Sequence, residues 1–401
     1  MQKKTKIKYS AIVTDGLWRK SLSAIRSLGK AGFDVTVMGD SVFTTGFWSK
    51  YTAKRVFSAS ASQNAQVFGE RLLHTLQKNR NKELTPVLFP MEDASLMWVT
   101  ENIERVKPYA SLLLPPKESL YIAQDKGKTI QAAIAAGISC PRTWQSDNLE
   151  DFINVVNELA PGSFIVKPTN GTGSSGIVYG EKLKDNDWKN HWGKYGNLII
   201  QERIPREGKG IGVAILMDEK GECKAFFVHK RLREYPVSGG PSTDRISIYN
   251  MDLVKKSINL LKSLSWKGIA MVEWKNDIRD GIPKLMEINP RFWGSLELAV
   301  RSGVDFPVLY AKLAMNENIE NITEYKEEIR CRWMIPGEIL RYLNQNNEEK
   351  EKFGDFLKGL PSEAEEWDKA DLPGTLGSFV CPAFLAINPR YWKYLKRRNS
   401  R

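Results

Sequence analysis

The chain has 401 residues, of which 42% are hydrophobic and 26% are charged, and its formal net charge at pH 7 is +12. This length exceeds the size at which one hydrophobic core usually keeps growing, so we expect two or three domains. The composition excludes a disordered chain, and no apolar run approaches the roughly 18 residues of a membrane-spanning helix. The basic start lacks the hydrophobic core of a signal peptide, so we expect a cytoplasmic protein.

The basic excess suits a polyanionic partner such as a nucleotide, a nucleic acid or an acidic lipid surface. Part of it is local, because four lysines lie in the first eight residues and more basic residues lie in the tail 393–401. These ends are either solvated or make a weak contact with a membrane surface, and no specific nucleic-acid binding is expected. The four cysteines lie far apart without a Cys-x-x-Cys pair, which argues against a zinc site or a disulfide framework.

The first third of the sequence alternates between strands and helices. Strands are predicted at residues 8–13, 33–38, 86–89 and 111–114, with helices after the first strand and at residues 91–106. This pattern is typical of a parallel sheet in a doubly wound, Rossmann-like α/β domain, which we place at residues 1–118.

The turn after the first strand does not carry the Gly-x-Gly-x-x-Gly fingerprint of a dinucleotide site. We therefore expect this domain to have a structural or substrate-side role. Four acids lie near the carboxyl ends of its predicted strands, where open α/β sheets bind ligands, but helix capping explains such positions equally well. They are Asp15, Asp40, Glu92 and Asp93.

The sequence next predicts helices at residues 120–136 and 149–159, followed by a β-hairpin with strands at 163–167 and 177–179. The hairpin loop alternates glycine with small hydroxyl residues, which lets backbone N–H groups converge on a phosphate. Lys167 would direct its ammonium group to the same place. The alternative is a flexible hairpin tip. The loop comprises Gly171, Thr172, Gly173, Ser174, Ser175 and Gly176.

A second hairpin carries the strongest local signal. A three-residue turn at residues 279–281 would place Glu273 opposite Glu287, and the two-residue period of a strand puts Asn289 on the same face. Two carboxylates and an amide oxygen on one face favour a Mg²⁺ site. Arg291, two residues further on, could reach a transferred phosphate. The alternative is an ordinary half-exposed hairpin.

These motifs, together with Asp125-Lys126 and the run Gln201-Glu202-Arg203-Ile204, resemble the ATP-grasp superfamily in order and approximate spacing. The resemblance covers residues 119–312. Within the superfamily the chain is similar to the carbamoyl-phosphate-synthase-like branch of predicted carboligases, and residues 1–118 are similar to the Rossmann-like domain that precedes that fold.

The resemblance implies ATP and Mg²⁺, or Mn²⁺ in its place, clamped between two small α+β lobes at residues 119–200 and 201–312. Lys126 and Lys167 would contact phosphates, and Glu273, Glu287 and Asn289 would hold the metal. The adenine and ribose would lie against the backbone of the segment that follows the first lobe. Its candidate residues are Gln201, Glu202, Ile204 and Glu207.

One further strand is strongly basic. The period of two would place His229, Arg231 and Arg233 on one face, where they could hold a carboxylate substrate or an acyl phosphate. A solvated edge strand protected by its charges is the alternative, and His229 lacks a paired acid that would support a role as catalytic base. Residues 313–401 are expected to form a helical extension. Its segment 383–395 either docks on the core, which is the default expectation, or lies on an anionic membrane.

From these features we expect a ligase that activates a carboxylate as an acyl phosphate and joins it to an amine or a related nucleophile. Small-molecule carboxylate and amine substrates are therefore the expected partners, and a homodimer is left open. A nucleotide-binding or polyanion-binding protein without activity is the alternative. A biotin-dependent carboxylase ranks last, because nothing resembles a biotinyl-lysine domain.

Overall fold

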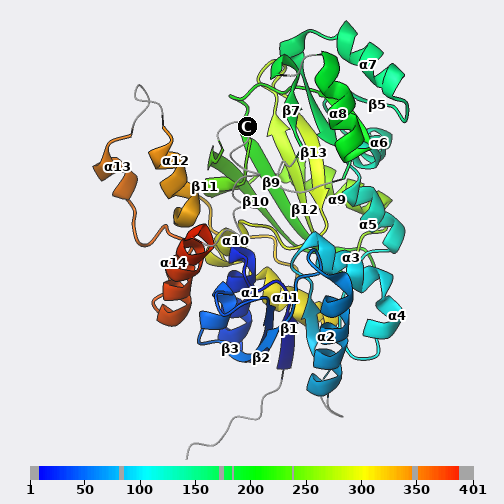
Figure 1. Cartoon of the computed structure of the whole chain (residues 1–401). Coiled ribbons are helices and arrows are strands. Elements are labelled where there is room, and N and C mark those ends of the chain that lie inside the picture. Colours follow the sequence, from blue (N-terminus) through cyan, green and yellow to red (C-terminus); the bar gives the residue numbers. More distant parts are fainter. Residues whose placement is uncertain are drawn as a thin grey trace, which may run out of the picture.

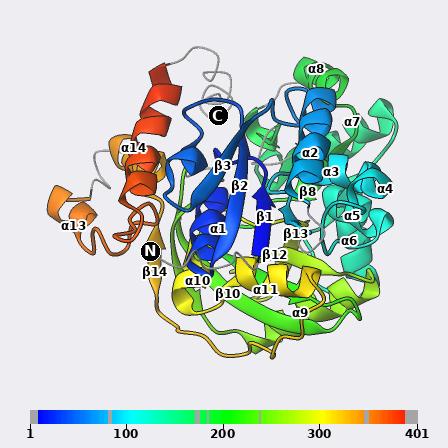
Figure 2. The ribbon, with the colours of Figure 1, turned by 90° about the horizontal axis from the view of Figure 1, so that it is seen from below.

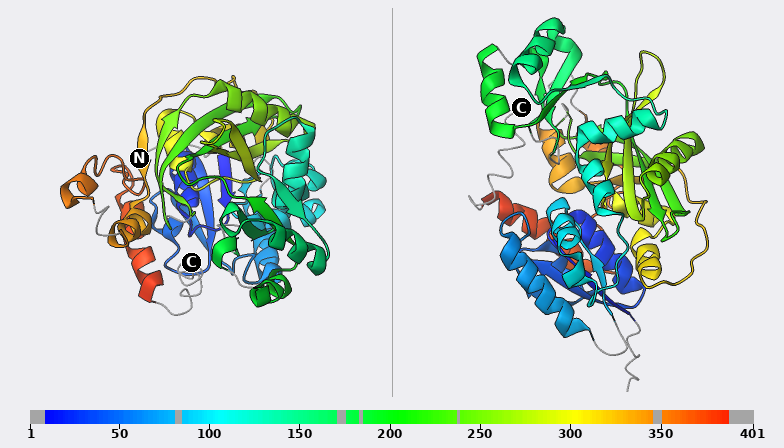
Figure 3. Two further views of the ribbon diagram at one scale, coloured as in Figure 1. Left: turned by 90° about the horizontal axis from the view of Figure 1, so that it is seen from above. Right: turned by 90° about the vertical axis from the view of Figure 1, so that its right-hand side faces the viewer.

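The computed structural model describes residues 9–80, 85–170, 176–182, 185–236, 239–345 and 351–387. Most of the predicted phosphate loop, Gly171 to Ser175, lies outside these ranges. The chain builds three sheets, and the first sheet, the six-stranded sheet and the small sheet occupy successive parts of the molecule (Figures 1 and 3). None of the helices in the described ranges is long and apolar enough to cross a membrane.

The first sheet is parallel and has the order β3-β2-β1-β4, which confirms the predicted doubly wound pattern. Its core forms because buried β-branched residues of the strands pack against one apolar stripe of α1. The elements are β1 (Tyr9–Val13), α1 (Arg19–Lys30), β2 (Phe33–Gly39), η1 (Thr45–Trp48), β3 (Thr52–Phe57), α2 (Ala65–Asn79), β4 (Val87–Phe89), α3 (Asp93–Glu101) and α4 (Ile103–Val106).

Two details of this sheet differ from the prediction. The strand predicted at residues 111–114 is reduced to a single bridge between Ser111 and Val87. Strand β3 was not predicted, because its exposed Lys54 and Arg55 break the apolar pattern. Charges of this kind are usual on an edge strand, and β3 lies at the edge of the sheet.

The small sheet has the order β5-β8-β6-β7, and all its strand pairs are antiparallel. The predicted hairpin is confirmed as β6 paired with β7. The helix predicted at residues 120–136 is wrong as one piece: the chain breaks at Asp125, whose side chain accepts the Lys128 N–H and begins a new helix. The elements are α5 (Lys117–Gln124), α6 (Lys126–Ala135), β5 (Thr143–Gln145), α7 (Leu149–Glu158), η2 (Pro161–Ser163), β6 (Phe164–Pro168), β7 (Val178–Tyr179), η3 (Gly180–Lys182), α8 (Asp185–Tyr195) and β8 (Leu198–Glu202).

The six-stranded sheet has the order β13-β12-β9-β10-β11-β14 and is the centre of the molecule (Figure 1). One face packs against α5, α6 and α9, and the other packs against α1, α10, α11 and the first sheet. The first domain therefore covers the face that carries Glu273. The elements are β9 (Gly210–Met217), β10 (Cys223–Glu234), β11 (Ser242–Ile248), α9 (Met251–Ser263), β12 (Gly268–Asn276), β13 (Pro283–Asn289), α10 (Leu296–Ser302), α11 (Phe306–Ala314) and β14 (Arg330–Arg332).

The C-terminal part is mainly helical, as predicted, but it begins by adding β14 to the edge of the six-stranded sheet. After a helical turn at Met334–Glu338, it forms α12 (Ile339–Leu343), α13 (Phe353–Leu357) and α14 (Leu372–Ile387). Figure 2 shows α14 at one side of the molecule, next to β3. The described part of this extension packs on the first domain. Most of the segment 383–395, for which docking was expected, lies outside the described residues.

Asp371 anchors this extension to the first domain. Its side chain is fully buried and accepts hydrogen bonds from Arg26 Nε at 2.9 Å, Ser49 Oγ at 2.8 Å and the Lys50 N–H at 2.8 Å. Because all three donors come from the first domain, the carboxylate joins parts of the chain that are more than 300 residues apart.

We expect Asp371→Ala to lower the free energy of unfolding by about 3–5 kcal/mol, because it removes the nearest carboxylate from the buried Arg26 guanidinium. Urea unfolding followed by fluorescence measures this change. The matched control is Asp252→Ala, which removes an exposed acid that pairs with Lys256 on α9, and it should cost less than about 1 kcal/mol. Equal costs for the two variants would contradict the anchoring role.

Candidate functional site

The site is built on the hairpin of β12 and β13. Glu273 lies directly opposite Glu287, as predicted, but the turn was predicted wrongly. The strands end at Asn276 and Pro283, so the connection has six residues instead of three. A bulge next to Trp274 inserts Met286 and restores the predicted register.

Asn289 joins the two glutamates. Its Nδ2 donates to Glu273 Oε1 at 3.2 Å and to Glu287 Oε1 at 3.3 Å, so the three side chains converge on one point. Burial raises the pKa of Glu273, Arg231 lowers it, and Glu287 raises it again, with a net upward shift. This carboxylate pair is therefore under electrostatic strain that a cation would relieve.

Glycines on β9 make room for these side chains. Gly212 pairs with Glu273 on one side and with His229 on the other. A Cβ atom at Gly212 would lie 2.2 Å from His229 Cε1, and one at Gly210 would lie 2.9 Å from the Arg231 side chain. The bare backbone of β9 thus lets groups from β10 reach the acidic pair on β12 and β13.

The small sheet presents two lysines to this pair. Lys167 is buried at the end of β6, and Lys126 begins α6, where its N–H donates to the Thr169 carbonyl at 2.9 Å. Burial and the nearby Lys126 lower the pKa of Lys167 to about 8, while Glu287 and Glu273 oppose the shift. Lys167 therefore lies within electrostatic reach of both carboxylates and of Lys126.

The predicted basic face is wrong for Arg233. Arg231 pairs with Arg245 of β11, but a bulge at Leu232 pairs Arg233 with the adjacent Asp244, which turns it to the opposite face. Arg231 Nη2 lies 2.5 Å from Glu273 Oε2 and therefore borders the site. Arg233 contacts Glu338 and Glu351 of the C-terminal extension, each at 3.0 Å.

His229 is buried, and its Nε2 lies 3.1 Å from the Ser295 hydroxyl, while its Nδ1 has no hydrogen-bond partner. Burial and the nearby Arg231, Arg245 and Arg19 hold the pKa of His229 well below its usual value. The ring is therefore neutral at pH 7 and a weak base. This agrees with the doubt about a catalytic role for it.

Arg291 lies beyond the end of β13 and not on its face, contrary to the prediction. Its Nε donates to Asp93 Oδ2 at 2.7 Å, and its Nη1 donates to the Phe292 carbonyl at 3.2 Å. Burial lowers the pKa of Arg291, but Asp93 and Glu92 more than offset this and raise it overall. Arg291 thus links the hairpin to the carboxyl end of the first sheet.

At that end of the sheet, Asp15 has a left-handed backbone conformation, with φ of 54°. Its Oδ2 accepts hydrogen bonds from Thr14 Oγ1 at 2.5 Å and Ser95 Oγ at 2.6 Å. Burial and the nearby Glu92 raise the pKa of Asp15. The neighbouring acids are paired: Glu92 with Lys20 at 2.6 Å and Asp93 with Arg291 at 2.7 Å. Asp15 itself forms no ion pair among the described residues.

The predicted adenine side lies along β8 and the segment after it. Gln201 is buried and donates to Thr143 Oγ1 at 2.9 Å, and Glu202 accepts the Arg142 N–H at 3.0 Å. The Ile204 carbonyl accepts Lys275 Nζ at 3.3 Å, and Glu207 is exposed and acts electrostatically on that lysine. Their predicted contacts with a nucleotide stay predictions.

A cavity of about 940 Å³ lies between the first sheet, the start of α6, the end of β13 and the C-terminal extension. It is lined by Asp15 and Asp93 from the first sheet, Lys126 from α6, and Glu287 and Asn289 from the hairpin. The C-terminal extension closes one side. Its lining residues there include Trp333, Ile335, Pro336, Glu365, Glu366, Ser378 and Pro382.

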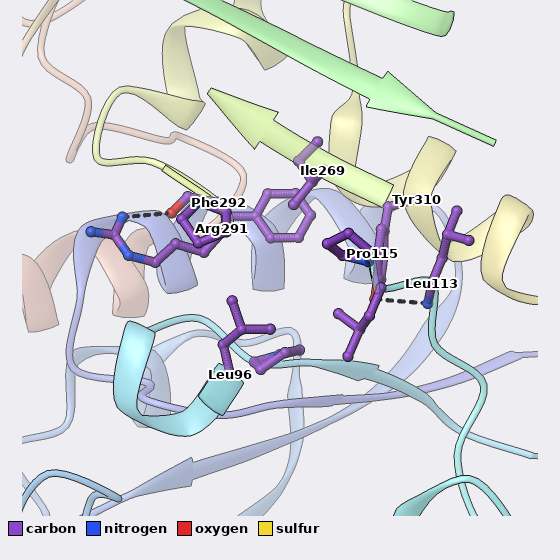
Figure 4. Close-up of a pocket in the computed structure, with 10 residues that line it drawn as sticks. Leu96, Leu113, Pro115, Ile269, Arg291, Phe292 and Tyr310 are labelled. Atoms are coloured by element: carbon purple, nitrogen blue, oxygen red, sulfur yellow. Dashed lines mark hydrogen bonds between the residues drawn. The ribbon is translucent and has the colours of Figure 1, made fainter. Parts of the chain in front are cut away.

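A second void, of about 10 Å³, lies behind Arg291 and holds at most one water. Figure 4 shows that Phe292 points into this packed junction beside Tyr310, whose hydroxyl accepts the Leu113 N–H, while the Arg291 guanidinium points away. This packed junction therefore holds the backbone at Arg291 and Phe292 in place beside the large cavity. It is too small to be a ligand site itself.

The hairpin supplies some, but not all, of the ligands that a divalent metal ion needs. The described residues contain no group of three or more His, Cys, Asp or Glu side chains that could hold a metal ion. Glu273 and Glu287 would supply two carboxylates, and a half turn of the Asn289 amide would direct its oxygen to the same point. Mg²⁺ is usually held by such a partial set, with phosphate oxygens and waters completing the shell.

Sequence analysis missed several cavity residues. Arg19 stacks on Trp333, with its Cζ 4.3 Å from the ring centroid, and also pairs with Glu365 at 2.9 Å. Lys20 is buried on α1. For Arg19 and Lys20, the only sequence signal is that two basic residues stand together at the start of α1. Nothing in the sequence indicates that Glu365, more than 300 residues away, lies in the same cavity wall.

Comparison with known proteins agrees with this arrangement. Residues 197–335 match the model of a family described as ATP-grasp in the biosynthetic pathway with Ter operon. A probable alpha-L-glutamate ligase of Stenotrophomonas maltophilia is 31% identical over 97 residues, which are 24% of this chain and 33% of that protein. The chain thus spans about a third of the curated relatives it matches.

Solved structures show the same fold. The biotin carboxylase domain of 2-oxoglutarate carboxylase from Hydrogenobacter thermophilus, solved with MgADP, ADP and bicarbonate, has a TM-score of 0.64 at 14% identity. The match covers 81% of this chain and 74% of that one. The L-amino acid ligase of Bacillus licheniformis has a TM-score of 0.57 at 16% identity, covering 77% and 75%. Residues 197–335 thus match an ATP-grasp family, and the chain shares the fold of these solved structures.

We expect the protein to take up protons when it binds ATP near and above pH 8. The folded Lys167 has a pKa of about 8, below its ordinary value, so its ammonium form is lost as pH rises through 8, and a bound phosphate would favour that form. The affinity should fall by up to about tenfold per pH unit above pH 8. Calorimetry in buffers of different ionisation enthalpy measures the uptake.

Lys167→Arg keeps the charge at all these pH values, so the proton uptake should disappear. The matched control is Lys128→Arg on the exposed side of α6, which should leave it unchanged. Proton uptake that persists in Lys167→Arg would contradict the proposed contact.

Proposed function

We propose that this protein is an ATP-dependent carboxylate–amine ligase that forms an acyl phosphate and releases ADP and phosphate. The observation that carries the proposal is the convergence of Glu273, Glu287 and Asn289 on one point, opposite two lysines and beside a cavity for substrates. In this proposal residues 1–118 supply the amine side, residues 119–200 and 201–312 hold the nucleotide, and residues 313–401 close the cavity.

ATP would enter with its phosphates between Lys167 and the acidic hairpin. A bound Mg²⁺ or Mn²⁺ ion would neutralise charge on the phosphate oxygens. Lys126 and Lys167 would hold the phosphates by charge, and Arg231, held by Glu273 at 2.5 Å, would face the substrate carboxylate. The protein would thus contribute positioning and charge more than covalent chemistry.

In the first step a carboxylate oxygen of the substrate attacks the γ-phosphorus, and the bond to the β-γ bridging oxygen breaks. The products are an acyl phosphate and ADP. In the second step an amine attacks the acyl carbon, the phosphate leaves, and the ammonium protons pass to a base. Arg291 borders both the hairpin and the first sheet, so it is placed to hold the transferred phosphate.

Asp15 is the group best placed to receive the amine. It lies at the carboxyl end of β1, where the strand order changes direction between β2 and β4, and α/β sheets bind ligands at such points. Its carboxylate lines the cavity, is fixed by two hydroxyl groups, and is not part of an ion pair among the described residues. A strained backbone that positions an acid in a cavity supports a functional role.

The rival proposal is a nucleotide-binding protein without activity. The convergence of Glu273, Glu287 and Asn289 beside a cavity large enough for substrates favours the ligase. Tight ATP binding without phosphate release under any pair of substrates would support the rival. The solved biotin carboxylases share the fold alone, and we do not extend their reaction to this chain.

Glu287→Gln should lower Mg²⁺-dependent ADP release by at least about 100-fold, because it removes a charge from the proposed metal site without changing its shape. The measurement is coupled ADP release with pairs of carboxylic acids and amines. The matched control is Glu222→Gln, an exposed acid that pairs with Lys262, and it should turn over as the parent does. Unchanged release in Glu287→Gln would contradict the ligase.

Asp15→Asn should raise the KM for the amine by about 10–100-fold and leave the KM for ATP unchanged, because a charged hydrogen bond to the ammonium is lost. The parent should also lose activity as pH falls through the raised pKa of Asp15, and the variant should not. Asp40→Asn is the matched control, since Asp40 lines the same cavity at the end of β2. Equal effects of the two variants would exclude a specific role for Asp15.

A further inference from the structure

The proposed reaction needs a base. An amine substrate enters at pH 7 mainly as an ammonium ion, whose nitrogen cannot attack until one proton is removed. Two acids at this end of the cavity are already engaged, since Glu92 pairs with Lys20 and Asp93 pairs with Arg291. Burial raises the pKa of Asp93, but Arg291 and Lys20 more than offset this and lower it. Neither acid is therefore a good proton acceptor, in contrast to Asp15.

Two hydroxyl groups occupy one oxygen of Asp15 and leave the other open. Oδ2 accepts Thr14 Oγ1 at 2.5 Å and Ser95 Oγ at 2.6 Å. Each hydroxyl oxygen also accepts a backbone N–H, from Met91 at 3.1 Å for Thr14 and from Glu92 at 3.2 Å for Ser95. The hydroxyl protons therefore point elsewhere, and Oδ2 is the nearest acceptor of both. No described residue forms a hydrogen bond with Oδ1, which is left for a ligand.

The backbone holds this carboxylate at the edge of the cavity. The Asp15 carbonyl accepts the Ser21 hydroxyl of α1 at 2.8 Å, and Gly16 donates its N–H to the Met38 carbonyl of β2 at 2.8 Å. A Cβ atom at Gly16 would lie 2.5 Å from Val37 Cγ1, so the turn lies directly against β2. The side chain of Asp15 lines the cavity, and the residue is only half-buried, so a substrate can reach it.

The first turn of α3 positions Asp15 and Arg291 together. Ser95 is the third residue of this helix and contacts Asp15, while Asp93 is its first residue and accepts Arg291 Nε at 2.7 Å. Asp15 and Arg291 also line the same cavity. Because Arg291 is the group proposed to hold the transferred phosphate, one helical turn would set the base in place relative to the acyl phosphate.

The charges around Asp15 suit a group that takes up and releases a proton. Burial and Glu92 raise its pKa, while Ser95, Thr14 and Lys20 oppose the shift. The carboxylate is thus a stronger base than an exposed aspartate, and no described cation forms an ion pair with it. A poised acid of this kind in a cavity is typical of proton transfer.

We propose, as a part of the ligase reaction above, that Asp15 is the catalytic base. Its Oδ1 takes one proton from the bound ammonium group, which leaves a neutral amine with a lone pair. The amine nitrogen attacks the acyl carbon, the bond from that carbon to the phosphate oxygen breaks, and the second proton leaves with the phosphate. Asp15 then releases its proton to solvent, which restores the starting state.

The test compares two nucleophiles in Asp15→Asn, with a carboxylic acid that supports ADP release. Hydroxylamine is mainly neutral at pH 7 and converts an acyl phosphate to a hydroxamate, which iron(III) colours. We expect kcat for amide formation to fall at least about 100-fold and hydroxamate formation to keep the parent's rate, because only the ammonium substrate needs a base. Asp40→Asn, the matched control in the same cavity, should keep both rates.

The pH dependence gives a second measurement that needs no variant. In the parent at saturating ATP, amide formation should fall as pH falls through the raised pKa of Asp15, because the base becomes protonated, and hydroxamate formation should not. In Asp15→Asn the remaining amide formation should rise about tenfold per pH unit between about pH 6 and 8, since only amine that is already neutral reacts. A carboxylate that only held the ammonium would raise KM and leave the parent's pH profile unchanged.

The outcomes separate the base from the ligase. Equal losses of amide and hydroxamate formation in folded Asp15→Asn, or no loss of either, would overturn the role of Asp15 and leave the ligase standing. A parent that forms no hydroxamate with any carboxylic acid would contradict the ligase and the base together. Thermal unfolding checks that Asp15→Asn is folded.

Discussion

The mutual repulsion of Glu273 and Glu287 is the constraint on which the rest of the site depends. Two carboxylates are held opposite each other across one hairpin, and burial raises the pKa of Glu273 further. The surrounding groups offset this strain: the Asn289 amide donates to both acids, Arg231 pairs with Glu273, and Lys167 lies within electrostatic reach of both. Each of these groups comes from a different element, so the fold as a whole serves to bring charges to one point.

That point is also where three parts of the chain meet. Strand β6 of the small sheet supplies Lys167, the six-stranded sheet supplies the two glutamates, and the first sheet supplies a separate acidic end around Asp15. Arg291 connects the last two through Asp93. A cavity with a cationic end for phosphates and an acidic end for an amine would hold two substrates of opposite charge side by side, which is what the proposed reaction requires.

The sequence predicted most of the local structure of this site, because alternation and glycine content are local signals. The opposition of Glu273 and Glu287 followed from strand periodicity. It holds although the turn is longer than predicted, because a bulge shifts the register back. The same periodicity failed for Arg233, because a bulge at Leu232 cannot be seen in the sequence. Contacts between distant segments, such as Arg19 with Glu365 or Arg26 with Asp371, depend on tertiary packing and carry no local signal.

The central claim is that a divalent cation binds between the two hairpin carboxylates. The most direct measurement is a crystal structure with a non-hydrolysable ATP analogue and Mn²⁺, located by its anomalous scattering. The account predicts a manganese peak about 2.0–2.5 Å from oxygens of both Glu273 and Glu287, with phosphate oxygens in the same shell. A bound nucleotide whose metal contacts neither carboxylate would contradict it.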